Sequence, residues 1–115
     1  MTRQGIGGND EREPWKPIAI GYNTGKTNQN QAAIAIGHQA GTLAQKEFAI
    51  AIGANAATNN QGIDSIAIGT YSGRLEQGNN CVAIGNNAAP DSQNNNTIVI
   101  NASGSALNTQ DIDSF

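Results

Sequence analysis

The chain has 115 residues, of which 37% are hydrophobic but only 4% aromatic, and it contains 14 Gly, 16 Asn and 9 Gln. This length fits one domain, yet so few large side chains exclude an ordinary hydrophobic core. The net charge of −3 provides no basic surface for nucleic acid, and no apolar run approaches the roughly 20 residues of a membrane helix. We therefore expect neither nucleic-acid binding nor membrane insertion.

The first segment, residues 1–16, differs from the rest of the chain in its charge. It holds six of the charged side chains, and its one large aromatic residue, Trp15, stands next to the repeats that follow. We predict an attachment arm that a partner protein orders, with Trp15 covering the open end of the fold. A flexible tail that frays is the alternative interpretation.

An internal repeat occupies residues 17–101. The string Ile-Ala-Ile-Gly or a close variant occurs six times at a constant spacing of 16 residues, with no insertion. β-Branched residues that alternate with small ones and end in Gly are typical of a short strand, and a strict repeat predicts stacked coils. We expect these strands to form the core or an oligomer interface: Ile18, Ala19, Ile20, Ile34, Ala35, Ile36, Ile50, Ala51, Ile52, Ile66, Ala67, Ile68, Val82, Ala83, Ile84, Ile98, Val99 and Ile100.

A glycine follows each of the first five strands, and Asn101 follows the sixth. Gly, with Asn as its substitute, is what a turn position with positive φ accepts. The predicted turn glycines are Gly21, Gly37, Gly53, Gly69 and Gly85.

The second half of each coil predicts a weaker strand. Small residues such as Gly25, Gly41 and Ala57 recur five positions after the second Ile, and Lys26 and Arg74 occupy the next position. We expect the charges to face outward and the small column to face inward, leaving space for the Ile pairs opposite. Each coil then has two strands and two turns, and at a strand spacing of about 4.8 Å six coils form a rod roughly 29 Å long.

A glutamine column recurs nine residues after each second Ile. Stacked amides one strand spacing apart can hydrogen-bond along the rod. We predict a structural amide ladder that caps the second turn; a row of ligand-binding side chains is the alternative. The column comprises Gln29, Gln45, Gln61, Gln77 and Gln93.

The Ile strands are apolar on both faces, because their Ala face is extended by the mostly small residues at 17, 33, 49, 65, 81 and 97. The coil's own second strand covers only one face. We therefore expect a homo-oligomer along the other, with either the Ile or the Ala face at the interface. The alternative is that exposed alanines are tolerated by solvent.

Residues 102–115 are predicted to cap the last coil or to begin a following segment. Nothing in the chain predicts catalysis, a cofactor or a metal site. His38 has no Cys or His partner at ligand spacing, and Cys81 has no base predicted nearby.

The strings at residues 34–41 and 66–73 resemble the head repeats of trimeric autotransporter adhesins of the YadA-like type. This resemblance implies a left-handed parallel β-roll and a homotrimer, although that family's repeat is commonly shorter than 16 residues. The last coil, residues 94–108, is similar to segments in surface and fibre proteins of large DNA viruses and phages.

Together these resemblances favour a non-enzymatic virion protein, a minor capsid, decoration or fibre component whose N-terminal arm contacts other virion or surface proteins. An adhesin head module at a bacterial cell surface, binding host ligands, is the alternative.

Overall fold

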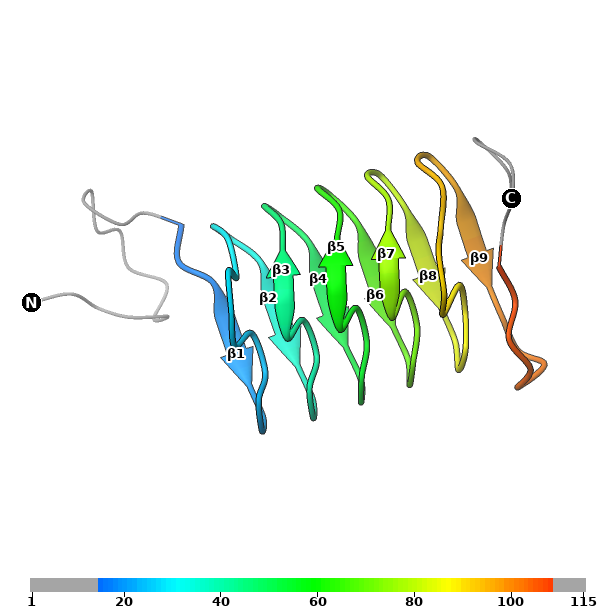
Figure 1. Ribbon diagram of the computed structural model, residues 1–115, viewed down its shortest axis with the longest axis horizontal. Helices are drawn as coiled ribbons and strands as arrows, with labels where there is room; N and C mark the ends of the chain where they lie inside the picture. The colour runs from blue at the N-terminus through cyan, green and yellow to red at the C-terminus, as the bar shows by residue number, and fades with distance from the viewer. Residues whose placement is uncertain (1–14, 109–115) are drawn as a thin grey trace, which may run out of the picture.

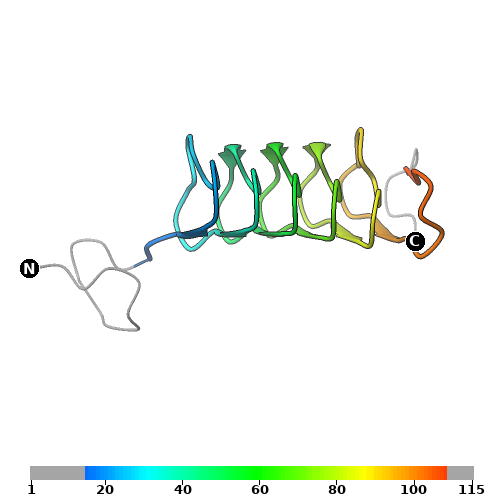
Figure 2. The same ribbon diagram turned by 90° about the horizontal axis from the view of Figure 1, so that it is seen from below.

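The computed structural model describes residues 15–108 and shows an all-β parallel solenoid of about five turns with 16-residue spacing (Figure 1). This confirms the predicted all-β solenoid and its period. Every coil repeats nearly the same outline along the rod (Figure 2). The predictions for residues 1–14 and 109–115, which include most of the arm and the end of the cap, lie outside the described residues.

The first sheet contains the Ile strands stacked in parallel, in the order β1-β2-β4-β6-β8-β9. Each residue pairs with the residue 16 positions later, as Ile34 does with Ile50, so the columns of the sequence are the columns of the sheet. The strands are β1 (Ile18–Ile20), β2 (Ile34–Ile36), β4 (Ile50–Ile52), β6 (Ile66–Ile68), β8 (Val82–Ile84) and β9 (Ile98–Ile100).

The second sheet begins two residues later than the small column that predicted it. It consists of β3 (Leu43–Gln45), β5 (Asn59–Gln61) and β7 (Leu75–Gln77), and an isolated bridge extends it on each side, at Thr27 and at Gln93. The middle residue of each strand has φ between 53° and 56°, so only the two outer residues pair. Because the middle residue is left-handed, the side chains of this strand do not alternate between outward and inward as the sequence interpretation assumed.

The turn after each of the first five Ile strands brings neighbouring backbones into contact, whereas Asn101, which follows β9, lacks the positive φ predicted for it, so that prediction is wrong. Gly53 has φ +127°, and a Cβ placed on it would lie 2.8 Å from both the carbonyl carbon and the oxygen of Gly69. Both the conformation and the lack of space therefore require glycine at this position.

The inner face of the first sheet is its Ala face. A Cβ placed on Gly41 would lie 3.2 Å from the Cβ of Ala35, and one on Gly73 would lie 3.1 Å from that of Ala67. The interior therefore has room for a methyl group opposite a glycine or alanine and none for an Ile side chain. The prediction that the small column leaves space for the Ile pairs is wrong, because the Ile side chains point outward. The largest alanine cluster comprises Ala35, Ala40, Ala51, Ala56, Ala57 and Ala67.

Candidate functional site

The glutamine column fills the part of the interior that the alanines leave open. Gln45 and Gln61 are completely buried, and Nε2 of Gln45 donates to Oε1 of Gln61 at 3.0 Å. The same Nε2 donates to the carbonyl of Ile34 in the first sheet at 2.7 Å and to that of Ala49 at 3.2 Å, across the turn that follows. The Gln45 amide thus links the two sheets, the turn between them and the next coil.

This amide ladder has one interruption. Gln29 donates to Gln45, and Gln77 donates to Gln93, both at 3.0 Å. Among the described residues, however, no hydrogen bond joins Gln61 to Gln77, and Oε1 of Gln77 is buried without a partner. Gln45, Gln61, Gln77 and Gln93 are buried and Gln29 is half-buried, so the column is mainly an internal structural element.

The small column that extends the Ala face is also internal. Ala33, Ala49, Ser65, Cys81 and Thr97 are all completely buried. The Cys81 thiol lies 2.9 Å from the carbonyl oxygen of Asn94 in the next coil, a contact that Ser65 makes through its hydroxyl to Gly78. The Ala face is therefore enclosed in every complete coil, and the Ile face is the one that remains available for an interface.

The outward Ile columns form an apolar surface that runs along the described rod. Ile20 and Ile100, in the two edge strands, are 58% and 61% exposed, whereas most of the Ile side chains between them are half-buried against their neighbours. These side chains lie in six neighbouring strands, and a contiguous exposed apolar surface of this kind marks an interaction site.

Charged residues are absent from the half of each coil that contains the Ile strand. The segments 18–25, 34–41, 50–57, 66–73, 82–89 and 98–105 contain no Asp, Glu, Lys or Arg. We call these segments the uncharged half. The charged residues of the described chain all lie in the other half: Lys16, Lys26, Lys46, Glu47, Asp64, Arg74, Glu76 and Asp91.

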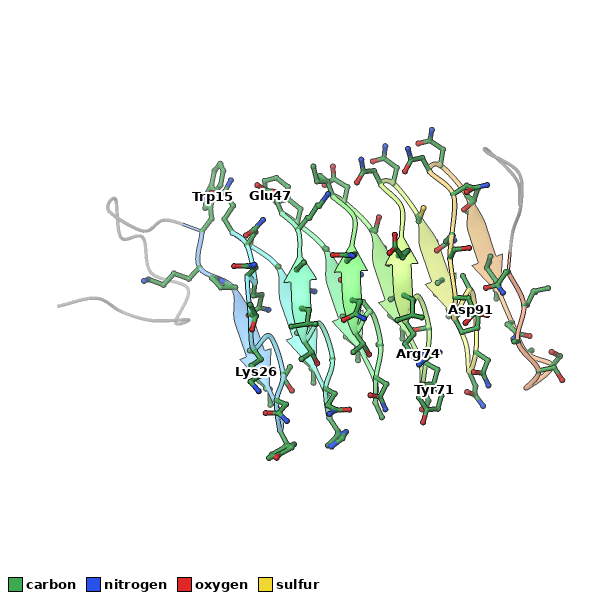
Figure 3. All side chains as sticks on the ribbon, in the orientation of Figure 1. Trp15, Lys26, Glu47, Tyr71, Arg74 and Asp91 are labelled. Atoms are coloured by element: carbon green, nitrogen blue, oxygen red, sulfur yellow. The ribbon has the colours of Figure 1, made fainter. Side chains whose placement is uncertain are left out.

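The two corners that flank the Ile face differ in the side chains that they carry (Figure 3). Trp15 and Glu47 lie at the upper corner, where the chain enters the Ile strands, and Tyr71 lies at the lower corner, where it leaves them. The Trp15 ring stacks obliquely with Phe48, their centroids 6.0 Å apart, and Trp15 itself remains 56% exposed.

At the lower corner the contacts are aromatic and cationic. The rings of Tyr22 and His38 stack 5.5 Å apart, and the Arg74 guanidinium lies 5.7 Å from the Tyr71 ring centroid. The same Arg74 approaches Asp91 at 3.7 Å, and both charged groups are well exposed. His38 is therefore an exposed ring in an aromatic pair.

Within residues 15–108, no group of three or more His, Cys, Asp or Glu side chains converges as a metal site would require. The same part of the chain forms no helix suited to crossing a membrane. Comparison with known protein families, curated proteins and solved structures gave no significant match.

The sequence contained the signal for the candidate surface, but the strand pattern alone did not identify it. Ile and Ala alternate equally well with either face inward, whereas the eight charge-free positions of every coil mark the side that holds the Ile face. A charge count by column would have located this surface.

Proposed function

We propose that this protein is a non-enzymatic structural rod whose copies associate side by side through the Ile face as a homotrimer. The observation that carries the proposal is that the outward Ile columns lie in a half of every coil without a charged residue. Such a surface meets a copy of itself without burying an unpaired charge, which would cost several kcal/mol. Because the columns run the whole length of the rod, parallel copies bring identical columns together.

We further propose that the assembly is a component of a virion, such as a minor capsid, decoration or fibre protein. The support is the resemblance of the last coil to segments of viral surface and fibre proteins and the resemblance of the repeats to trimeric β-rolls. The left-handed winding and the three-fold state rest on that second resemblance and stay predictions. A rigid rod without a predicted catalytic centre suits such a role.

The mass of the purified chain in solution, measured by multi-angle light scattering at several concentrations, tests the association. We expect close to three times the 11.9 kDa of one chain. The variant Ile52→Lys places a charge in the middle of the Ile face, so it should be monomeric while keeping the β-sheet circular dichroism of the parent.

Thr58→Lys is the matched control, because Lys26 and Arg74 already occupy its column on the opposite side of the coil. It should keep the mass of the parent. A parent that remains monomeric at all concentrations, or an Ile52→Lys variant with the parent's mass, would show that the Ile face is not the self-association surface.

A further inference from the structure

A shallow polar hollow of about 360 Å³ lies on the charged half of the coil, away from the Ile face. Its rim includes Lys46, Asn60, Glu76, Asn79 and Asn95, which come from four successive coils. This volume is at the lower end of the roughly 300–1,000 Å³ of small-molecule sites. The hollow is therefore large enough for one small ligand.

Two glycines change the corner of the coil beneath the hollow. The column that holds Asn30, Lys46 and Asn94 in other coils holds Gly62 and Gly78 here. A Cβ placed on Gly62 would lie 2.3 Å from the carbonyl oxygen of Gly78, so no side chain fits between these coils. The neighbouring coil fills the place of a side chain at both glycines, and their backbone lines the hollow.

The asparagines beside these glycines are held in a defined orientation. Oδ1 of Asn79 accepts a hydrogen bond from the backbone N–H of Ile63 at 2.9 Å, and Oδ1 of Asn95 accepts one from the N–H of Asn79 at 2.8 Å. Because a backbone N–H can only donate, these bonds decide which end of each carboxamide is the oxygen. Both Nδ2 groups then remain as donors, and among the described residues neither has a hydrogen-bond partner.

The chemistry of the rim combines these donors with an acceptor. The two Nδ2 groups recur at one strand spacing, about 4.8 Å, and the Lys46 ammonium adds a third donor. The Glu76 carboxylate is an acceptor, and its charge offsets that of Lys46. A ligand hydroxyl group can accept a hydrogen bond from these donors and donate one to Glu76. The Glu76 charge cancels the attraction that Lys46 alone would exert on a phosphate or carboxylate ligand.

We propose that this hollow binds a neutral polyhydroxylated ligand, either one monosaccharide unit or a small polyol. The site lies outside the uncharged half, so association through the Ile face leaves it accessible. The proposal is independent of the proposed function, because it concerns a different wall of the coil. No aromatic side chain lines the hollow to stack on a sugar ring, so the dissociation constant should be in the millimolar range.

The test is a titration of the ¹⁵N-labelled full-length chain, followed by NMR, with glucose, galactose, N-acetylglucosamine and glycerol, each to about 50 mM, well above a millimolar dissociation constant. We expect the side-chain NH₂ signals of Asn79 and Asn95 to shift in a saturable way with at least one of them. Glucuronate and glucose 6-phosphate should shift these signals less at the same concentration.

The variant Asn95→Asp keeps an oxygen for the N–H of Asn79, removes the Nδ2 donor and adds one negative charge. It should weaken the binding by about fivefold or more, the effect of one lost hydrogen bond. Asn96→Asp is the control, because it makes the same charge change one residue away, outside the rim of the hollow. No saturable shift with any neutral compound, equal weakening by both variants, or tighter binding of the anions would each overturn the proposal.

Discussion

Gly53→Ala tests whether the glycine corners set the spacing of the coils. An alanine would have to adopt φ +127°, which costs about 1–3 kcal/mol for a side chain that carries a Cβ. The added methyl would also lie 2.8 Å from the carbonyl group of Gly69, where only backbone can move aside, and overpacking of this kind costs about 1–3 kcal/mol. Together they should lower the free energy of unfolding by about 2–6 kcal/mol, a large part of the 5–15 kcal/mol of an ordinary domain.

Gly104→Ala separates the two contributions to this cost. Gly104 also has a positive φ, +82°, but a Cβ placed on it meets no atom within 4 Å. This variant therefore incurs only the backbone cost, about 1–3 kcal/mol, and should lie near the lower end because the site is open. The difference between the variants measures how tightly the third and fourth coils are packed.

Urea and thermal unfolding followed by circular dichroism provide both values. For a domain of this size, the loss predicted for Gly53→Ala lowers the Tm by roughly 10–30 °C. A Gly53→Ala variant within about 1 kcal/mol of the parent, or equal losses for both variants, would refute the idea that contact between coil backbones requires glycine at this corner.

Two further predictions concern the interior. Gln61→Leu removes the amide that donates to the carbonyls of Ile50 and Ser65, so it should lower the free energy of unfolding by about 2–4 kcal/mol. The control Gln31→Leu, at an exposed position, should change this free energy by less than about 0.5 kcal/mol. Similar losses for the two variants in urea unfolding would contradict a structural role for the ladder. The Cys81 thiol is completely buried, so its reaction with a disulfide reagent should be no faster than unfolding, and rapid labelling of the folded protein would show that the coil opens at this column.

The repeat made the architecture predictable, because a strict period of 16 residues leaves only stacked coils as a solution. The columns of Ile and Gly identified the first sheet and its corners with the correct register. The pairing of Ile34 with Ile50 follows from the spacing alone. In a solenoid, residues one period apart in the sequence are neighbours in space, so the sequence repeat predicts the long-range contacts. Few other folds allow this.

The orientation of the Ile strands was not predictable from the same pattern. The usual rule places the larger apolar side chain inside, and it fails here because the coil is too narrow. The interior is so narrow that a Cβ placed on Gly41 would lie only 3.2 Å from that of Ala35, a distance that depends on the folded backbone and cannot be deduced from the sequence. The start of the second sheet was missed for a related reason, since the positive φ of Ala44, Asn60 and Glu76 leaves no clear signature in these residue types.

The hollow could not be predicted from the sequence because its lining comes from four successive coils. Gly62 and Gly78 interrupt a column of larger side chains, a change that is visible in the sequence but has no meaning until the coils are stacked. The orientation of Asn79, fixed by the N–H of Ile63, likewise depends on contact between residues 16 positions apart.

The narrow interior and the outward Ile face have one physical origin. A methyl group that faces a glycine buries little apolar area, so each coil is held together mainly by backbone hydrogen bonds and by the amides of the glutamine column. The side chains able to contribute about 1.5–3 kcal/mol each on full burial are the Ile residues, and the coil cannot enclose them. Most of the Ile side chains between the edge strands are already half-buried against their neighbours, so only the remaining exposed part of their apolar area, largest at Ile20 and Ile100, would be buried by another surface on the Ile face. The proposed association of rods would therefore draw on side chains other than those that fill the interior of the single rod.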